Sequence, residues 1–80
     1  MKDPVPRIYA DANEADADGR FWLHIPGSRR DIDRYGDRLQ PGMRVLFNVQ
    51  NEFEVEGILE IDEVHGTWLG RPDYDTIRYL

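Results

Sequence analysis

The stretch Arg44–Ile61, RVLFNVQNEFEVEGILEI, decides the fold of this chain. Apolar and polar residues alternate through both of its halves, and a period of two is typical of strands that bury one face. The apolar positions are Val45, Phe47, Val49, Phe53, Val55, Leu59 and Ile61. Gln50-Asn51-Glu52 between the halves is a polar connection of hairpin length. The stretch therefore predicts an antiparallel hairpin, and Gly57 on its apolar face predicts a bulge or a sharp bend.

Shorter strands are predicted upstream of this hairpin. Arg7–Ala10 and Phe21–Ile25 are apolar-rich segments, and the turn signal Asp18-Gly19 lies between them. Pro26-Gly27 ends the second segment, because proline cannot donate to a sheet ladder. We expect residues 7–11 and 20–25 to pair antiparallel.

The segment near 29–39 predicts one short helix or turn. Ser28 with Asp31 three residues later fits a capping box at a helix N-terminus. Ile32, Tyr35 and Leu39 then fall near one helical face. Pro41-Gly42 ends the segment before the central hairpin begins.

Downstream, His65-Gly66 is a dipeptide typical of tight hairpin turns. It predicts a returning strand at 67–70 and, after a turn at 73–75, a last short strand at 77–80. Six short strands separated by turn signals indicate an all-β fold, a small antiparallel barrel of five to six strands. We expect an OB-like barrel over residues 7–80 as a single domain, with residues 1–6 as a loose lead-in. The order hairpin, hairpin, turn, last strand also fits an SH3-like barrel, which stays open as the alternative.

Composition limits the classes of function. The chain has 80 residues, no cysteine and a net charge of −6, so disulfides and Cys-based metal sites are excluded and binding to duplex DNA is disfavoured. It has no signal-peptide pattern and no apolar run long enough to span a bilayer, and we expect a cytoplasmic protein without a membrane partner. Of its ten basic residues nine are arginine, the residue suited to planar and stacking contacts.

No pattern of residues predicts catalysis, a cofactor or a metal site. Asp16-Ala17-Asp18-Gly19 matches the first half of a calcium loop, but Ile25 occupies the position of the closing carboxylate, so a solvated loop is expected. His24 and His65 have no metal-ligand spacing. No Cys and no Gly-x-Ser-x-Gly elbow supplies a nucleophile. We therefore expect a binding protein and not an enzyme.

The predicted binding residues lie on the first two strands and on the Arg-rich segment that follows. If Ile8 and Phe21 face the core, antiparallel pairing places their neighbours on one outer face, where aromatic rings beside cations can stack unpaired bases. The predicted set is Arg7, Tyr9, Trp22, His24, Arg29, Arg30 and Arg34, with the arginines on phosphates. Alternatively, Trp22 is covered by the segment after Val64 or by a partner protein.

These residues resemble the bacterial cold-shock domain, a five-stranded OB barrel. Phe21–Ile25 is similar to its motif Val-Phe-Val-His-Phe, and Arg7 and Tyr9 fall on the Lys and first Phe of its Lys-Gly-Phe-Gly-Phe-Ile. Its motif Leu-x-x-Gly-x-x-Val-x-Phe-x-Val is matched by Leu39, Gly42, Val45, Phe47 and Val49. The glycines of Gly-Phe-Gly-Phe are absent here, and the resemblance covers only residues 7–60. It implies binding to single-stranded RNA or DNA. The competing hypothesis is a protein-interaction module, either a monomer or a weak homodimer.

Overall fold

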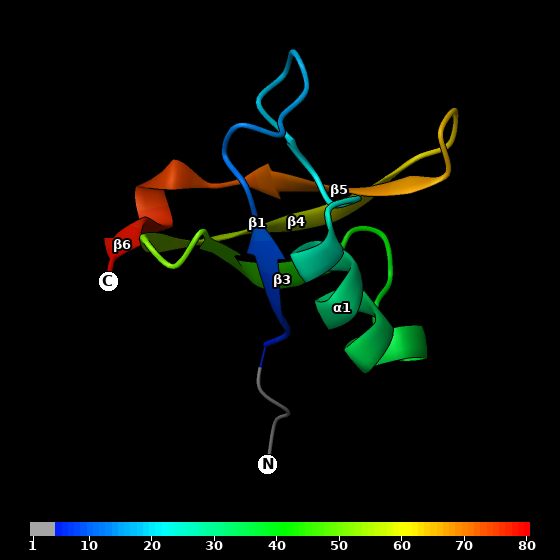
Figure 1. The fold of residues 1–80 in the computed structure, drawn as a ribbon, viewed down its shortest axis with the longest axis horizontal. Helices are drawn as coiled ribbons and strands as arrows, with labels where there is room; N and C mark the ends of the chain where they lie inside the picture. The colour runs from blue at the N-terminus through cyan, green and yellow to red at the C-terminus, as the bar shows by residue number, and fades with distance from the viewer. Residues whose placement is uncertain (1–4) are drawn as a thin grey trace.

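The computed structural model describes residues 5–80 and forms a curled, mixed sheet that makes a half-barrel, with one short helix beside it (Figure 1). The strands are β1 (Arg7–Ala10), β2 (Phe21–Trp22), β3 (Arg44–Val49), β4 (Phe53–Asp62), β5 (Thr67–Pro72) and β6 (Arg78–Tyr79). The helix α1 spans Pro26–Tyr35, and 3-10 turns occupy Gly36–Arg38 and Tyr74–Thr76. The strand order is β1-β3-β4-β5-β2, with β6 paired to the start of β4. The predicted barrel-like β fold with one short helix is thus confirmed in outline.

The central hairpin forms as predicted, from β3 and β4 with Val49 opposite Phe53. Gln50 and Asn51 adopt φ of 55° and 59°, and the Asn51 backbone N–H donates to Asn48 Oδ1 at 3.0 Å. The predicted bulge at Gly57 is wrong, because the ladder to β3 runs through this residue without interruption and the ladder to β5 begins at it, opposite Pro72.

The predicted antiparallel pairing of β1 with β2 is also wrong. β1 pairs in parallel with β3, Ile8 opposite Phe47 and Ala10 opposite Val49, whereas β2 pairs antiparallel with β5. Parallel neighbours need a long crossover connection, and the chain between β1 and β3 contains α1. Ile8 and Ala10 are completely buried in this arrangement. The apolar pattern of β1 therefore requires a core on one face of the strand but does not determine whether β2 or β3 is its neighbour. The sheet is therefore mixed rather than purely antiparallel.

Helix α1 covers the edge of β1 that faces away from β3. The Ser28 hydroxyl donates to the Tyr9 carbonyl, and the Tyr9 N–H donates to Asp31 Oδ2 at 2.8 Å. The Arg7 N–H donates to the Tyr35 hydroxyl oxygen at 3.0 Å. The spacing of 28, 31 and 35 places these three side chains on one helical face. Side chains of α1 thus satisfy backbone groups that a further strand would otherwise pair.

The same contacts explain why the expected helix start is wrong. The N-cap is Ile25, and Pro26 occupies the first turn, where its missing N–H is not needed. Ser28 is fully buried and bonds to β1 instead of capping the helix.

The core lies on the concave side of the sheet, under α1. Its buried apolar residues are Ile8, Ala10, Phe21, Leu23, Leu39, Val45, Phe47, Val49, Val55 and Leu59. Phe21 and Phe47 meet edge to face with ring centroids 5.5 Å apart. Within residues 5–80 no helix has the length and apolar character needed to cross a membrane. Of the expected lead-in, residues 1–4 lie outside the described residues, and the Pro6 carbonyl accepts a hydrogen bond from the Leu46 N–H at 2.9 Å.

Candidate functional site

The structure separates the residues that the sequence placed on one outer face. β1 and β2 stand at opposite ends of the strand order, so Arg7 and Tyr9 do not share a ladder with Trp22 and His24. The Tyr9 ring packs on α1, where a Cβ at Gly27 would lie 2.7 Å from its Cδ1. Tyr9 therefore belongs to the contact between strand and helix.

Arg7 is also engaged within the molecule. Its guanidinium binds Glu54 Oε2 at 2.7 Å, and Arg78 binds Glu54 Oε1 at 3.0 Å. Hydrogen bonds from Arg78 and then from Arg7 hold the pKa of Glu54 below its usual value, against the opposing effect of desolvation. Glu54 is nearly buried, and the two arginines compensate its charge.

Trp22 and His24 do lie together, with a third ring that the sequence analysis did not assign to the site. The Trp22 and His24 ring centroids are 6.3 Å apart, and those of Trp22 and His65 are 5.6 Å apart. We call these three residues the aromatic rim. Trp22 is half-buried, while both histidines are exposed. His65 was interpreted only as a turn residue, and no local pattern indicates that the β4–β5 turn returns to β2.

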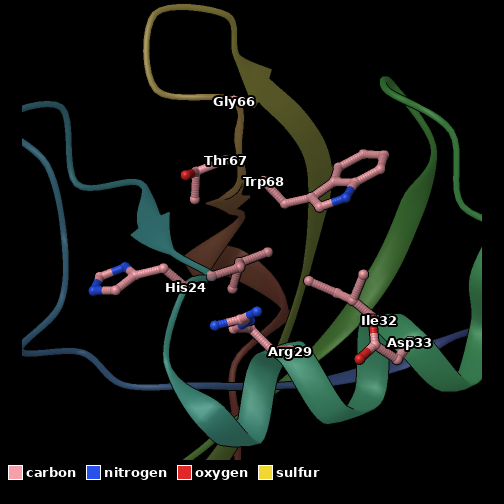
Figure 2. A pocket seen from close by; sticks show the side chains of 8 residues that line it. His24, Arg29, Ile32, Asp33, Gly66, Thr67 and Trp68 are labelled. Carbon is pink, nitrogen blue, oxygen red and sulfur yellow. The ribbon is translucent and has the colours of Figure 1, made fainter.

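A groove opens beside the aromatic rim, between α1 and the β4–β5 hairpin (Figure 2). It has a volume of about 410 Å³ and is lined by Leu23, His24, Arg29, Ile32, Asp33, Gly66, Thr67 and Trp68. Leu23, Ile32 and Trp68 supply its apolar lining, and His24 connects it to the rim. The Leu23 N–H donates to the Trp68 carbonyl at 3.0 Å, which fixes the chain after β2 to β5.

Two of the predicted arginines have no ionic partner within residues 5–80. Arg29 and Arg30 are exposed, and no carboxylate of the described chain lies within 4.0 Å of either guanidinium. Arg34 is 4.0 Å from Asp31 on the same helix. Of the three, only Arg29 lines the groove. The site that the structure brings together thus contains Trp22, His24 and Arg29 from the predicted set.

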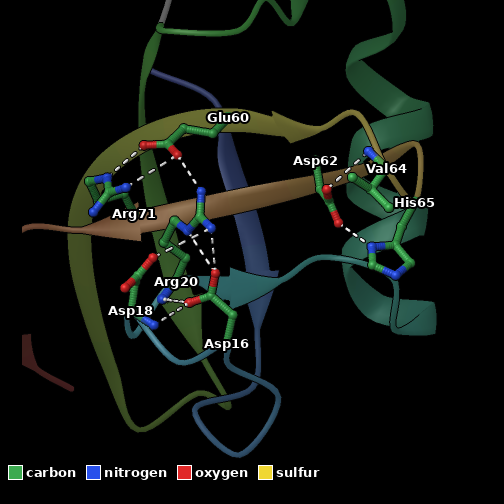
Figure 3. A network of polar contacts seen from close by, with 8 residues as sticks. All are labelled: Asp16, Asp18, Arg20, Glu60, Asp62, Val64, His65 and Arg71. Carbon is green, nitrogen blue, oxygen red and sulfur yellow. Dashed lines mark hydrogen bonds and ion pairs between the residues drawn. The ribbon is translucent and has the colours of Figure 1, made fainter.

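A network of charges centred on Arg20 joins the loop before β2 to β4 and β5 (Figure 3). Arg20 binds Asp16 at 2.7 Å and Glu60 at 2.9 Å, and Arg71 binds Glu60 at 2.6 Å. Hydrogen bonds from Arg71 and Arg20 hold the pKa of Glu60 below its usual value. The carboxylates that suggested a calcium loop therefore bind arginine, and no metal-ligand group of three occurs among residues 5–80.

His65 is held at the tip of the β4–β5 hairpin by Asp62. The Asp62 carboxylate contacts His65 Nδ1 and accepts a hydrogen bond from the Val64 N–H at 3.1 Å. The hydrogen bond with His65 is the main cause of a lowered pKa of Asp62. This contact orients the imidazole ring that packs on Trp22.

Comparisons with protein-family models, curated proteins and solved structures found no match to this chain. Function is therefore inferred from the groove, its aromatic rim and its unpaired arginines.

Proposed function

We propose that this protein is a small non-catalytic binding module that binds single-stranded RNA or DNA weakly. The observation that carries the proposal is the position of Arg29, which lines a groove of mixed polar and apolar character that contains Trp68, and which has no carboxylate partner in the described chain. Unpaired bases pack on aromatic rings and on guanidinium planes, while the phosphates that connect them attract arginine. The groove and the aromatic rim supply both kinds of contact.

The charge distribution supports this choice of surface. The chain has a net charge of −6, but several carboxylates are already paired with arginines, among them Glu54, Glu56 and Glu60. The unpaired arginines Arg29 and Arg30 are both on α1, beside the groove. A nucleic acid would thus approach along α1, with Arg30 and Arg34 available to phosphates. Few phosphates can be neutralised in this way, so we expect weak affinity.

We also propose that the fold is OB-like, with an SH3-like barrel as the alternative. The curled, open sheet supports the OB-like interpretation, because OB barrels are partly open and bind nucleic acids on one face. The succession β3, β4, β5, 3-10 turn and β6 supports the SH3-like alternative.

The alternative function, a protein-interaction module or a weak homodimer, is favoured by a different surface. Tyr79 and Leu80, at the C-terminal end of the described chain, are 75% and 64% exposed, which is high for large apolar side chains. The Tyr79 ring packs on the Phe53 ring with centroids 5.9 Å apart. Both residues of β6 are nevertheless exposed. Sedimentation of the wild type and of Tyr79→Ser tests this function, and a dimer that the substitution dissociates would support it.

Tryptophan fluorescence tests nucleic-acid binding directly. The wild type is titrated at low salt with oligo-dT and with a mixed-sequence RNA, and we expect a saturable change. The variants Trp22→Phe and Trp68→Phe assign the response, since each retains one tryptophan. A stacked base is worth about 1–3 kcal/mol by alanine substitution, so Trp22→Ala or Trp68→Ala should weaken binding by at least that order. No change up to about 100 μM oligonucleotide, the weak end of non-specific affinities, rejects the proposal.

A further inference from the structure

The groove carries two opposite charges that do not pair with each other. Arg29 and Asp33 lie four residues apart on α1, both line the groove and both are exposed. Figure 2 shows both side chains projecting from α1 beside the groove. Within residues 5–80 neither has an ion-pair partner. The order of the pair explains this in part, because a basic residue preceding an acidic one at this spacing is the weaker orientation on a helix.

The space beside this pair suits one ring system and not a folded chain. The groove volume of about 410 Å³ is near the lower end of small-molecule sites. Its apolar lining of Leu23, Ile32 and Trp68 can receive the face of a base. A ligand that fills it must then satisfy a planar donor, the guanidinium, and a planar acceptor, the carboxylate, with polar groups on its edge.

Guanine fits this requirement better than the other bases. Its O6 and N7 are paired acceptors that arginine contacts in a bidentate manner. Its N1–H and N2 amino group are adjacent donors that a carboxylate can accept in the same manner. Adenine and uracil have neither an adjacent acceptor pair nor an adjacent donor pair, and cytosine lacks the donor pair. Residues four apart on a helix have Cβ atoms about 5–6 Å apart, which suits two neighbouring edges of one purine.

We propose that the groove selects guanine in single-stranded nucleic acid, with Arg29 contacting its O6 and N7 and Asp33 contacting its N1–H and amino group. This inference rests on the proposed nucleic-acid binding and names the base that the groove accepts. A bidentate contact discriminates against a wrong base by about 1–3 kcal/mol, so loss of either contact should weaken binding about five- to 150-fold.

The test compares four oligonucleotides that differ at one central position of a dT background. The position holds thymine, guanine, hypoxanthine, which lacks the amino group, or 7-deazaguanine, which lacks N7. A single guanine avoids quadruplex formation. For the wild type we expect guanine to bind at least fivefold more tightly than each of the other three.

Two groove variants and one control assign the contacts. Asp33→Asn should remove the preference for guanine over hypoxanthine, and Arg29→Ala, which leaves no donor for N7, should remove the preference over 7-deazaguanine. Asp37→Asn removes the same charge at an exposed position outside the groove and should change neither ratio. Circular dichroism verifies that each variant is folded.

The failures of the two proposals are distinguishable. Equal binding of all four oligonucleotides overturns the guanine inference and leaves nucleic-acid binding in place. The inference is also overturned if the Asp33→Asn protein binds all four oligonucleotides more tightly than the wild type by the same factor. Asp33 would then only repel phosphate. No binding of any oligonucleotide overturns both.

Discussion

The ring of Phe47 lies against the backbone of Gly70, so close that a Cβ on Gly70 would lie 2.4 Å from Phe47 Cζ. The same ring covers Gly57, where a Cβ would lie 2.7 Å from Phe47 Cε2 and 2.2 Å from the Arg71 carbonyl oxygen. One aromatic residue on β3 thus fills the space over glycines of β4 and β5. Close approach of ring and backbone, and not a bulge, is the reason for glycine at position 57.

This contact predicts that Gly70→Ala destabilises the protein. The added methyl group must displace a fully buried ring, and overpacking of a core costs about 1–3 kcal/mol. Urea denaturation should show that loss in the free energy of unfolding. In the Phe47→Leu background the same substitution should cost less, because the smaller side chain leaves room, and additive losses would contradict the explanation.

The covering of the β1 edge by α1 predicts a second loss of stability. Asp31→Ala removes the acceptor of the Tyr9 N–H, and an unsatisfied buried donor costs about 1–3 kcal/mol. Asp31→Asn keeps an acceptor oxygen and should cost less. Asp37→Ala, at an exposed position on the following 3-10 turn, is the matched control. Equal unfolding free energies for the Asp31→Ala and Asp37→Ala proteins would show that α1 docks without this bond.

The Arg20–Glu60–Arg71 network predicts a dependence of stability on pH. The pKa of Glu60 is lower in the folded protein than its usual value of about 4.3. Between these two pKa values the unfolded chain binds more protons, so stability is complete above about pH 4.3 and is lost as the pH falls through the lowered pKa. Glu60→Gln should destabilise the protein at pH 7. It should also reduce the fall in the free energy of unfolding at low pH, the acid limb of the stability curve.

The control for the pH experiment is Glu63→Gln, an exposed position without an ion pair in the described chain. Its unfolding free energy should follow the wild-type curve between pH 3 and 7. A Glu60→Gln curve parallel to that of the wild type would show that Glu60 does not contribute to the acid limb.

The local part of the fold could be predicted from the sequence, and the long-range part could not. The alternation of Arg44–Ile61 determines a hairpin because both strands and their turn are contiguous. The partner of β1 is not determined by its own pattern, since Ile8 and Ala10 can be buried against either neighbour. Ser28 was misassigned for a similar reason: its bond to the Tyr9 carbonyl depends on tertiary packing.

The candidate site could be predicted only in part, because some of its residues are neighbours in sequence and others meet only through tertiary packing. Trp22 and His24 are neighbours in sequence and stay neighbours in space. His65, Asp33 and Trp68 reach the site only because the β4–β5 hairpin and α1 enclose one groove. The Arg-rich segment around Arg29 predicts a contact with phosphate. The place of Arg29 in the groove also allows contact with a base.

Salt dependence separates these two roles of Arg29. A contact with phosphate releases counterions, so its removal should lower the slope of log K against log salt by about 0.7 for a single strand. A contact with a base weakens binding of the preferred sequence and leaves that slope unchanged. We expect Arg29→Ala to weaken binding of the guanine oligonucleotide more than that of oligo-dT, with little change in slope. Arg30→Ala, one residue away and outside the groove lining, should lower the slope and weaken both oligonucleotides equally. If the two variants behave alike, Arg29 acts only as a charge, and selection of guanine must be abandoned.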